Sequence, residues 1–287
     1  MKKNQSSKTA EGVAIIRAIE SAKPADIRIC YDPFARMMVP TLSYYLSKWV
    51  IKSGLYGKYA QGLIELLVVR ERYIDDFIKK TLQGKTGQVV ILGAGFDTRA
   101  YRMPEMAGKR VFDVDHPDTQ KVKLKRLARL TNIVRKPVTY VPIDFNSQSL
   151  ADALFKKGYD PETETLFIWQ GVTVYLNEES VDQTLAFISR NAASGSAVVF
   201  DYFDKKALQD TSRPEIKMMH RSAKLTQENF LFGIDSKHIE NFMDERGFIK
   251  IVDSSAEALS RIYFTGKNSG RIVLNGFHIV SAKVKGS

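Results

Sequence analysis

The alternation of apolar and polar positions divides the chain into two parts with different periods. From residue 87 onward, short apolar runs alternate with polar segments of helical length, which is typical of a doubly wound parallel sheet. The last two runs lie too close together for a long helix. We therefore expect an α/β protein with a Rossmann-like, doubly wound, seven-stranded sheet, mostly parallel with an antiparallel edge. The predicted strands cover residues 88–92, 109–114, 138–142, 165–170, 196–202, 248–252 and 272–282.

The first 86 residues have helical periodicity and predict an N-terminal helical cap, with residues 87–287 as the core. A disordered tail is expected over residues 1–8, followed by a helix from Thr9 to about Ala22. The apolar face of this helix is predicted to consist of Val13, Ile16 and Ile19.

Two further segments complete the predicted cap. The aromatic stretch 41–52 is expected to pack against the core, with contact to a membrane surface as the alternative. A long helix is predicted from about Tyr59 to Leu82, and Arg70 falls on its apolar face. A buried guanidinium group needs an anionic partner, because an unpaired buried charge is destabilising. That partner is either the carboxylate of a ligand or an Asp or Glu of the protein.

A glycine loop follows the first predicted strand. The apolar run 89–92 ends at Gly93-Ala94-Gly95, and a polar turn and a helix are expected next. Glycines there let the backbone approach a ligand closely. A dinucleotide fingerprint would have a third glycine where Thr98 stands, and there is no Walker sequence. The loop favours S-adenosylmethionine (SAM), which has no phosphates, while a dinucleotide or a plain strand-turn-helix stays open.

Acidic residues follow the next two predicted strands. Asp113 or Asp115, about twenty residues past the loop, is placed to accept the hydroxyl protons of a ribose. Asp144 can accept from an adenine amino group, and Phe145 can pack on the ring and donate its backbone N–H. Their order after the glycine loop predicts an adenosine site at the carboxyl edge of the sheet.

An insertion of about residues 203–236 separates the fifth and sixth predicted strands. It leaves from the carboxyl end of the sheet, where ligands bind in such folds. We expect it to be a mobile lid over a substrate pocket, with a plain pair of surface helices as the alternative. Its apolar and aromatic side chains include Met218, Met219, His220, Phe230 and Phe232.

Composition narrows the class of protein. The 287 residues contain one cysteine, Cys30, and four scattered histidines, so neither an internal disulfide nor a metal site is expected. No signal peptide and no membrane span is predicted, and a cytoplasmic location is expected. The net charge of +11 makes RNA a candidate partner. The densest basic run, from Lys121 to Arg129, is instead expected to be a solvated helix face.

Seven motifs together resemble one family. The chain is similar to the leucine carboxyl methyltransferase family of class I SAM-dependent methyltransferases, and within it to the bacterial branch of the tetracenomycin polyketide O-methyltransferase type. The resemblance covers residues 9–200 and continues more weakly to the end. The motifs are TAEG at 9–12, DPFA at 32–35, RERYIDD at 70–76, LGAGFDTRAYR at 92–102, DVDHP at 113–117, VPIDF at 141–145 and WQGVTVYL at 169–176.

The resemblance implies roles for individual residues around SAM. Arg17 and Arg70 would hold the carboxylate of SAM, and Gly93, with the rest of its loop, would lie against the methionine part.

At the other end of the cofactor, Asp115 would bind the ribose, and Asp144 with Phe145 the adenine. Gln170 stands where the family usually has Glu and would contact the SAM amino group without charge assistance. Asp113 also replaces a common Glu.

The implied function is an O-methyltransferase that transfers a methyl group by in-line displacement to a carboxylate or hydroxyl of a small-molecule, polyketide-like or peptide acceptor. A hydroxyl acceptor would profit from a base, for which Tyr175 and His220 are the candidates. One alternative is an RNA methyltransferase, although the segment after the fourth strand lacks an Asn/Asp-Pro-Pro-aromatic motif. Another is a SAM-binding protein with lost or weak activity, which Gln170 suggests.

Overall fold

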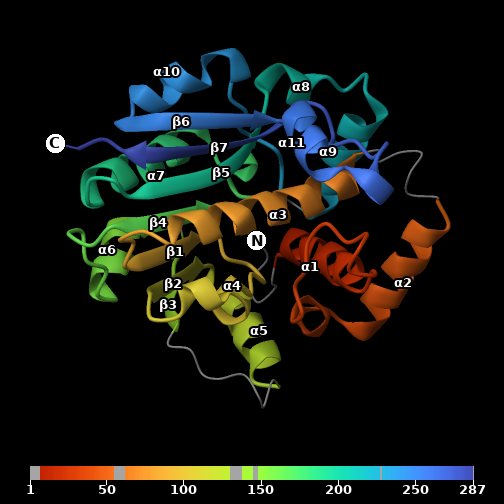
Figure 1. The fold of residues 1–287 in the computed structure, drawn as a ribbon, viewed down its shortest axis with the longest axis horizontal. Coiled ribbons are helices and arrows are strands. Elements are labelled where there is room, and N and C mark those ends of the chain that lie inside the picture. The colour runs from red at the N-terminus through yellow and green to blue at the C-terminus, as the bar shows by residue number, and fades with distance from the viewer. Residues whose placement is uncertain (1–6, 55–61, 130–137, 145–147, 227, 287) are drawn as a thin grey trace.

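The sheet predicted from the sequence is present in the computed structural model, which describes residues 7–54, 62–129, 138–144, 148–226 and 228–286. Within these residues it has seven strands in the order β3-β2-β1-β4-β5-β7-β6 (Figure 1). The first five strands are parallel, and β7 runs antiparallel to both β5 and β6. The strands are β1 (Gln88–Leu92), β2 (Arg110–Asp115), β3 (Val138–Pro142), β4 (Thr165–Trp169), β5 (Ala197–Phe203), β6 (Phe248–Ser255) and β7 (Phe277–Val284).

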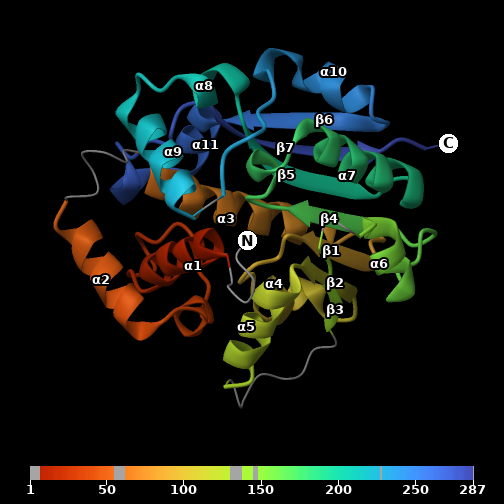
Figure 2. The same cartoon turned by 180° about the vertical axis from the view of Figure 1, so that it is seen from behind.

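Helices cover both faces of the sheet. Figure 1 shows α3 crossing the front of the sheet. Figure 2, seen from the opposite side, shows α6 and α7 on the other face. The α-helices are α1 (Lys8–Ser21), α2 (Thr41–Lys52), α3 (Leu63–Thr81), α4 (Arg99–Arg102), α5 (Pro117–Leu127), α6 (Leu150–Lys156), α7 (Glu178–Asn191), α8 (Lys205–Gln209), α9 (Pro214–Thr226), α10 (Ile239–Asp244) and α11 (Ala256–Tyr263).

Alternate residues of the central strands enter two separate apolar cores. Val89 and Ile91 of β1 pack in one cluster with α3 and α11, whereas Val90 and Leu92 pack in the other with α6, α7 and α10. All five residues of β1 are buried. Burial on both faces explains why the central strands are unbroken apolar runs in the sequence.

The predicted strand bounds agree with the first five strands to within one residue at each end. The last strand begins at Phe277 rather than at residue 272, because residues 275 and 276 form a turn in which Gly276 has a φ of +88°. Just before this turn, the N–H of Leu274 donates to the carbonyl of Gly62 at 3.1 Å. The apolar residues before the turn therefore pack beside the start of α3 instead of extending the strand.

The expected apolar face of the first helix is confirmed in part. Ile16 and Ile19 pack against the apolar cores, but the more deeply buried residues are Ala14, Ile15 and Ala18, and Val13 lines a cavity. Residues 1–6 of the predicted tail lie outside the described residues. Ser7 caps the helix by accepting the N–H of Ala10 at 3.1 Å, and the helix itself begins at Lys8.

The expected core packing of the stretch 41–52 is also wrong. The stretch forms α2, in which Tyr44 alone is buried. Leu42, Tyr45, Leu46 and Trp49 are between 60% and 80% exposed. The part of the predicted third helix before Gly62 lies outside the described residues, and Arg70 is buried on α3 as predicted.

The basic run on α5 is not a uniformly solvated face. Lys123 is fully buried and forms an ion pair with Asp113 of β2, while Lys121 and Lys125 are exposed. The charge available to an anionic partner on this helix is therefore smaller than the sequence indicates. No helix among the described residues combines the length and apolarity needed to cross a bilayer.

Candidate cofactor and acceptor site

The glycine loop after β1 is enclosed by protein on two sides. Gly93 and Gly95 have φ values of +61° and +49°, a region that glycine adopts without strain. A Cβ atom on Gly93 would lie 2.4 Å from Cγ2 of Val172, and one on Gly95 would lie 3.1 Å from Cβ of Ala10. Ala94 between them is buried. The loop is thus held between α1 and the segment after β4.

Asp115, at the end of β2, is the acidic residue that adjoins this loop. Its carboxylate accepts the backbone N–H groups of Gly95 and, at 2.6 Å, of His116. Burial raises the pKa of Asp115 to about 6, and the Gly95 N–H partly opposes this effect. Asp113, the other candidate for the ribose, instead forms the ion pair with Lys123.

The predicted adenine site is described only in part. Asp144 follows β3, and its backbone N–H donates to Oε1 of Gln148 at 2.9 Å. Phe145 lies outside the described residues. The structure therefore places Asp144 next to the end of β3, at the same edge of the sheet as Asp115, and says nothing of its aromatic neighbour.

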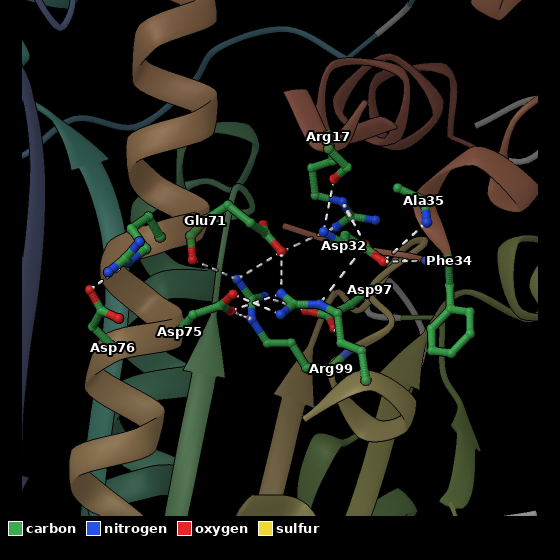
Figure 3. A network of polar contacts seen from close by, with 12 residues as sticks. Arg17, Asp32, Phe34, Ala35, Glu71, Asp75, Asp76, Asp97 and Arg99 are labelled. Carbon is green, nitrogen blue, oxygen red and sulfur yellow. Dashed lines mark hydrogen bonds and ion pairs between the residues drawn. The ribbon is translucent and has the colours of Figure 1, made fainter. Parts of the chain in front are cut away.

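A buried ionic cluster joins α1, α3, α4 and the glycine loop (Figure 3). At its centre Arg99 is fully buried, with Nε 2.7 Å from Oδ1 of Asp75 and Nη2 3.0 Å from Oε1 of Glu71. Its Nη1 donates to Asp97. The members of the ionic cluster are Arg17, Asp32, Glu71, Asp75, Asp97, Arg99 and Arg102.

Arg17 connects the cap to the glycine loop through this cluster. Its guanidinium donates to the carbonyl of Phe96, and its Nε lies 3.3 Å from Oδ2 of Asp32. The other oxygen of Asp32 accepts the N–H groups of Phe34 and Ala35, both at 3.0 Å. These hydrogen bonds form a turn at Asp32-Pro33-Phe34, and the contact with Arg17 fixes its position against α1.

The ionic cluster contains one more carboxylate than guanidinium groups. Three arginines, Arg17, Arg99 and Arg102, face the four acidic members among the described residues. Burial alone would raise the pKa of Glu71, but the three guanidinium groups outweigh it and lower that pKa. Glu71 is therefore ionised at neutral pH, and the surplus negative charge favours a cation nearby.

Gln170, at the end of β4, presents an unpaired acceptor beside this charge. Its Nε2 donates to Oε2 of Glu71 at 2.9 Å. Its Oε1 is buried and has no hydrogen-bond partner among the described residues. A buried acceptor without a partner is unfavourable unless a ligand supplies the donor. The SAM ammonium group is such a donor, and SAM as a whole carries a net positive charge.

Arg70 has a partner within the protein. Its Nη1 lies 2.9 Å from Oδ2 of Asp201, which sits inside the buried strand β5. Oδ1 of Asp201 accepts the N–H of Gly171 at 2.6 Å. Of the two alternatives for Arg70, the structure thus shows the salt bridge. Asp201 was not predicted as a site residue, although an acidic residue inside an apolar strand indicates a buried cationic partner.

A cavity of about 540 Å³ lies beside Arg70 and Gly171. Most of its wall is apolar and comes from α1, α2, α3, α9 and the turn after β4. The predicted insertion contributes to it. The apolar side chains that line it include Val13, Ile16, Leu46, Val50, Leu63, Leu67, Val174, Phe203, Met218, Met219 and Phe230, and the charged ones are Lys8, Arg70, Asp201 and Glu228.

The two predicted bases occupy different environments. Tyr175 lines the cavity with its ring 5.4 Å from that of Phe230, and burial together with Glu228 raises its pKa. His220 places Nε2 2.9 Å from the carbonyl oxygen of Leu208 and is not among the lining residues. Glu228 was not predicted from the sequence, because it lies in a polar segment where nothing distinguishes it from a surface residue.

Comparisons with known proteins agree with this architecture. The sequence profile of the leucine carboxyl methyltransferase family matches residues 10–189. Two relatives bear the name "Putative S-adenosyl-L-methionine-dependent methyltransferase". The one from Mycolicibacterium smegmatis is 33% identical over 72% of this chain and 69% of its own length. The one from Mycobacterium ulcerans is 29% identical over 77% of this chain and 74% of its own length.

Solved structures show the same fold. A "putative methyltransferase" from Thermobifida fusca aligns with a TM-score of 0.60 at 14% identity, covering 99% of this chain and 97% of that chain. Phosphoethanolamine N-methyltransferase 2 from Haemonchus contortus, in complex with SAM, aligns with a TM-score of 0.51 at 15% identity, covering 86% of this chain and 59% of that chain.

Fold, glycine loop and relatives together define a SAM-dependent methyltransferase. The chain belongs to the leucine carboxyl methyltransferase family.

Proposed function

We propose that this enzyme is an O-methyltransferase whose acceptor binds in the apolar cavity. The observation that carries the proposal is the position of that cavity: its wall includes Arg70 and Gly171, the residue after Gln170. The carboxyl end of β4 would thus serve both sites, with the cofactor on one side and the acceptor on the other. An acceptor enclosed by apolar walls reacts out of contact with water.

The residues at the cofactor end suit SAM. Gln170 would receive the ammonium group, with the ionised Glu71 behind its amide, and Asp115 would receive the ribose hydroxyls. Arg17 and the loop 93–95 would bind the methionine part, beside the salt bridge of Arg70 with Asp201.

Asp144 and Phe145 would bind the adenine. When bound, SAM supplies a methyl group already activated by its sulfonium, so the chain mainly orients donor and acceptor.

The parts of the chain would divide the work. Residues 1–86 would form the cap, residues 87–287 the core, and residues 203–236 a lid. Support for the lid comes from Met218, Met219 and Phe230, which belong to the insertion that follows β5 and which line the cavity. Tyr175 would orient the acceptor rather than act as a base, because burial raises the pKa of its phenol and makes the phenolate less available. The acid–base role of His220 stays a prediction.

The test is a transfer assay with methyl-labelled SAM, alongside calorimetric titration with SAM and with S-adenosylhomocysteine. We expect micromolar binding of both and transfer of label to members of a panel of apolar acids and phenols. Label in an ester is released by mild base, whereas label in an ether is retained. Binding of SAM with transfer only to amines or RNA would contradict O-methylation. A folded protein that binds neither compound would contradict the assigned site.

A further inference from the structure

Two polar atoms among the residues that line the cavity have no partner. Nε of Arg70 and Oε2 of Glu228 are buried without a hydrogen bond among the described residues. They are of opposite kind, since a guanidinium N–H only donates and a carboxylate oxygen only accepts. The Nη1 of Arg70 is already engaged by Asp201 at 2.9 Å. A ligand in the cavity can therefore satisfy one donor and one acceptor.

We infer that the acceptor is an apolar molecule that reacts through a hydroxyl group, and that Glu228 accepts the hydrogen of this group. The inference rests on the proposed function and narrows its acceptor class. A hydroxyl both donates and accepts, so it matches an acceptor such as Oε2 of Glu228 and a donor such as Nε of Arg70. A carboxylate acceptor has no hydrogen to donate and would place a like charge against Glu228.

The charges around the cavity support this choice. Arg70 and Asp201 compensate each other within their salt bridge, and Lys8 is exposed at the start of α1. Glu228 has no cation within ion-pair distance among the described residues. Among the described residues, the wall around it thus has a carboxylate available to take a proton, and the charge of its buried cation, Arg70, is already balanced by Asp201.

The transfer step balances with Glu228 as the base. The hydroxyl oxygen of the acceptor forms the bond to the methyl carbon, and the carbon–sulfur bond of the donor breaks with its electron pair kept by sulfur. The hydroxyl proton moves to Oε2 of Glu228. The products are a methyl ether, a neutral sulfide and a protonated Glu228, which returns its proton to solvent when the ether leaves.

A binding experiment tests the acceptor class directly. 4-Hexylphenol and 4-hexylbenzoic acid share one skeleton and differ in the reacting group. Each is titrated calorimetrically at pH 7 into the protein saturated with S-adenosylhomocysteine. We expect wild type to bind the phenol at least tenfold more tightly than the benzoate, and Glu228→Gln to lose this preference. Glu245→Gln, at an exposed position directly after α10 that is not among the cavity-lining residues, makes the same chemical change and should keep it.

A transfer experiment tests the proton-accepting role. At pH 7, Glu228→Gln should lower the turnover of 4-hexylphenol about a hundredfold, the usual size of general-base catalysis. The deficit should shrink as the pH approaches about 10, where a phenol ionises without help. A residue that only shapes the cavity would give a deficit that does not vary with pH.

Several results would overturn the inference. They are a benzoate that binds as tightly as the phenol, failure of both probes to bind, equal behaviour of Glu228→Gln and Glu245→Gln, or a deficit without pH dependence. Failure of S-adenosylhomocysteine itself to bind is a separate result, because it would refute the proposed cofactor site before the acceptor is tested.

Discussion

In the ionic cluster around Arg99, the arginines of α4 pair with Glu71 and Asp75 of α3 through contacts of 2.7–3.0 Å. In the cavity next to it, apolar side chains surround polar atoms of Arg70 and Glu228 that have no partner. Each carboxylate of the first region already has a guanidinium partner within the protein, whereas Glu228 in the second has no cationic partner among the described residues. We infer that the cluster fixes α1, α3 and α4 beside the glycine loop, where the cofactor would bind. Substitutions in the cavity wall could then alter which acceptor binds without disturbing the cofactor site.

The largest expected effect is on the cluster. Arg99→Met leaves buried carboxylates without their central partner and should lower the free energy of unfolding by about 3–5 kcal/mol. Arg72→Met is the matched control, because Arg72 pairs with Asp76 while 46% of its side chain is exposed, and it should cost at most about 1 kcal/mol. Urea unfolding followed by circular dichroism measures both. Equal losses would show that the buried cluster contributes no more to stability than an exposed ion pair.

A smaller effect is expected where the cluster meets the cofactor. The family motif alone predicts that Gln170→Glu tightens SAM binding through charge assistance. In the structure the amide of Gln170 donates to Glu71, so a carboxylate there would face another carboxylate. SAM binding should weaken by about 1.4–2.7 kcal/mol, or ten- to a hundredfold.

The double variant Glu71→Gln with Gln170→Glu exchanges the two groups and should recover most of this affinity, with the coupling read from a double-mutant cycle. Calorimetric titration with SAM gives each value. Tighter binding by the single variant would mean that Gln170 does not depend on Glu71.

The smallest effect concerns the ionisation of Asp115. Its pKa is raised to about 6, above the ordinary aspartate value, so the neutral form is favoured by folding. The stability that this provides is fully present below about pH 4 and is lost as the pH rises through 6. Ribose binding needs the ionised form, so SAM affinity should fall about tenfold between pH 7 and pH 5. Asp115→Asn should abolish this dependence, and an unchanged profile in that variant would assign it to another group.

The sequence allowed the first five strands to be predicted to within one residue at each end, because buried strands leave short apolar runs, whereas β6 continues to Ser255 and β7 begins only at Phe277. The glycine loop was equally clear, since glycines at 93 and 95 are required by their positive φ values. The outcome for the helices was different. In α1, Val13 and Ile16 line a cavity. The sequence cannot show whether an apolar residue lines a cavity or packs in the core, because both positions favour the same residue types.

Long-range pairing could not be predicted either. Arg70 clearly needed an anion, but Asp201 lies 131 residues away, and other acidic residues were equally eligible. Lys123 belonged to a run of basic residues, so nothing indicated that it alone would be buried against Asp113. The contribution of Glu228 depends on the shape of the cavity around it, which no local pattern encodes.

The position of β7 in the sheet has a consequence for how the chain reaches its native state. Residues 277–284 lie between β5 and β6, although both of those strands precede them in the chain. During synthesis, β5 and β6 have no hydrogen-bonded neighbour on these sides until residue 284 has been made. The nascent protein therefore presents two open strand edges over this period, which are sites for mispairing with other chains, and the sheet closes only in one late step.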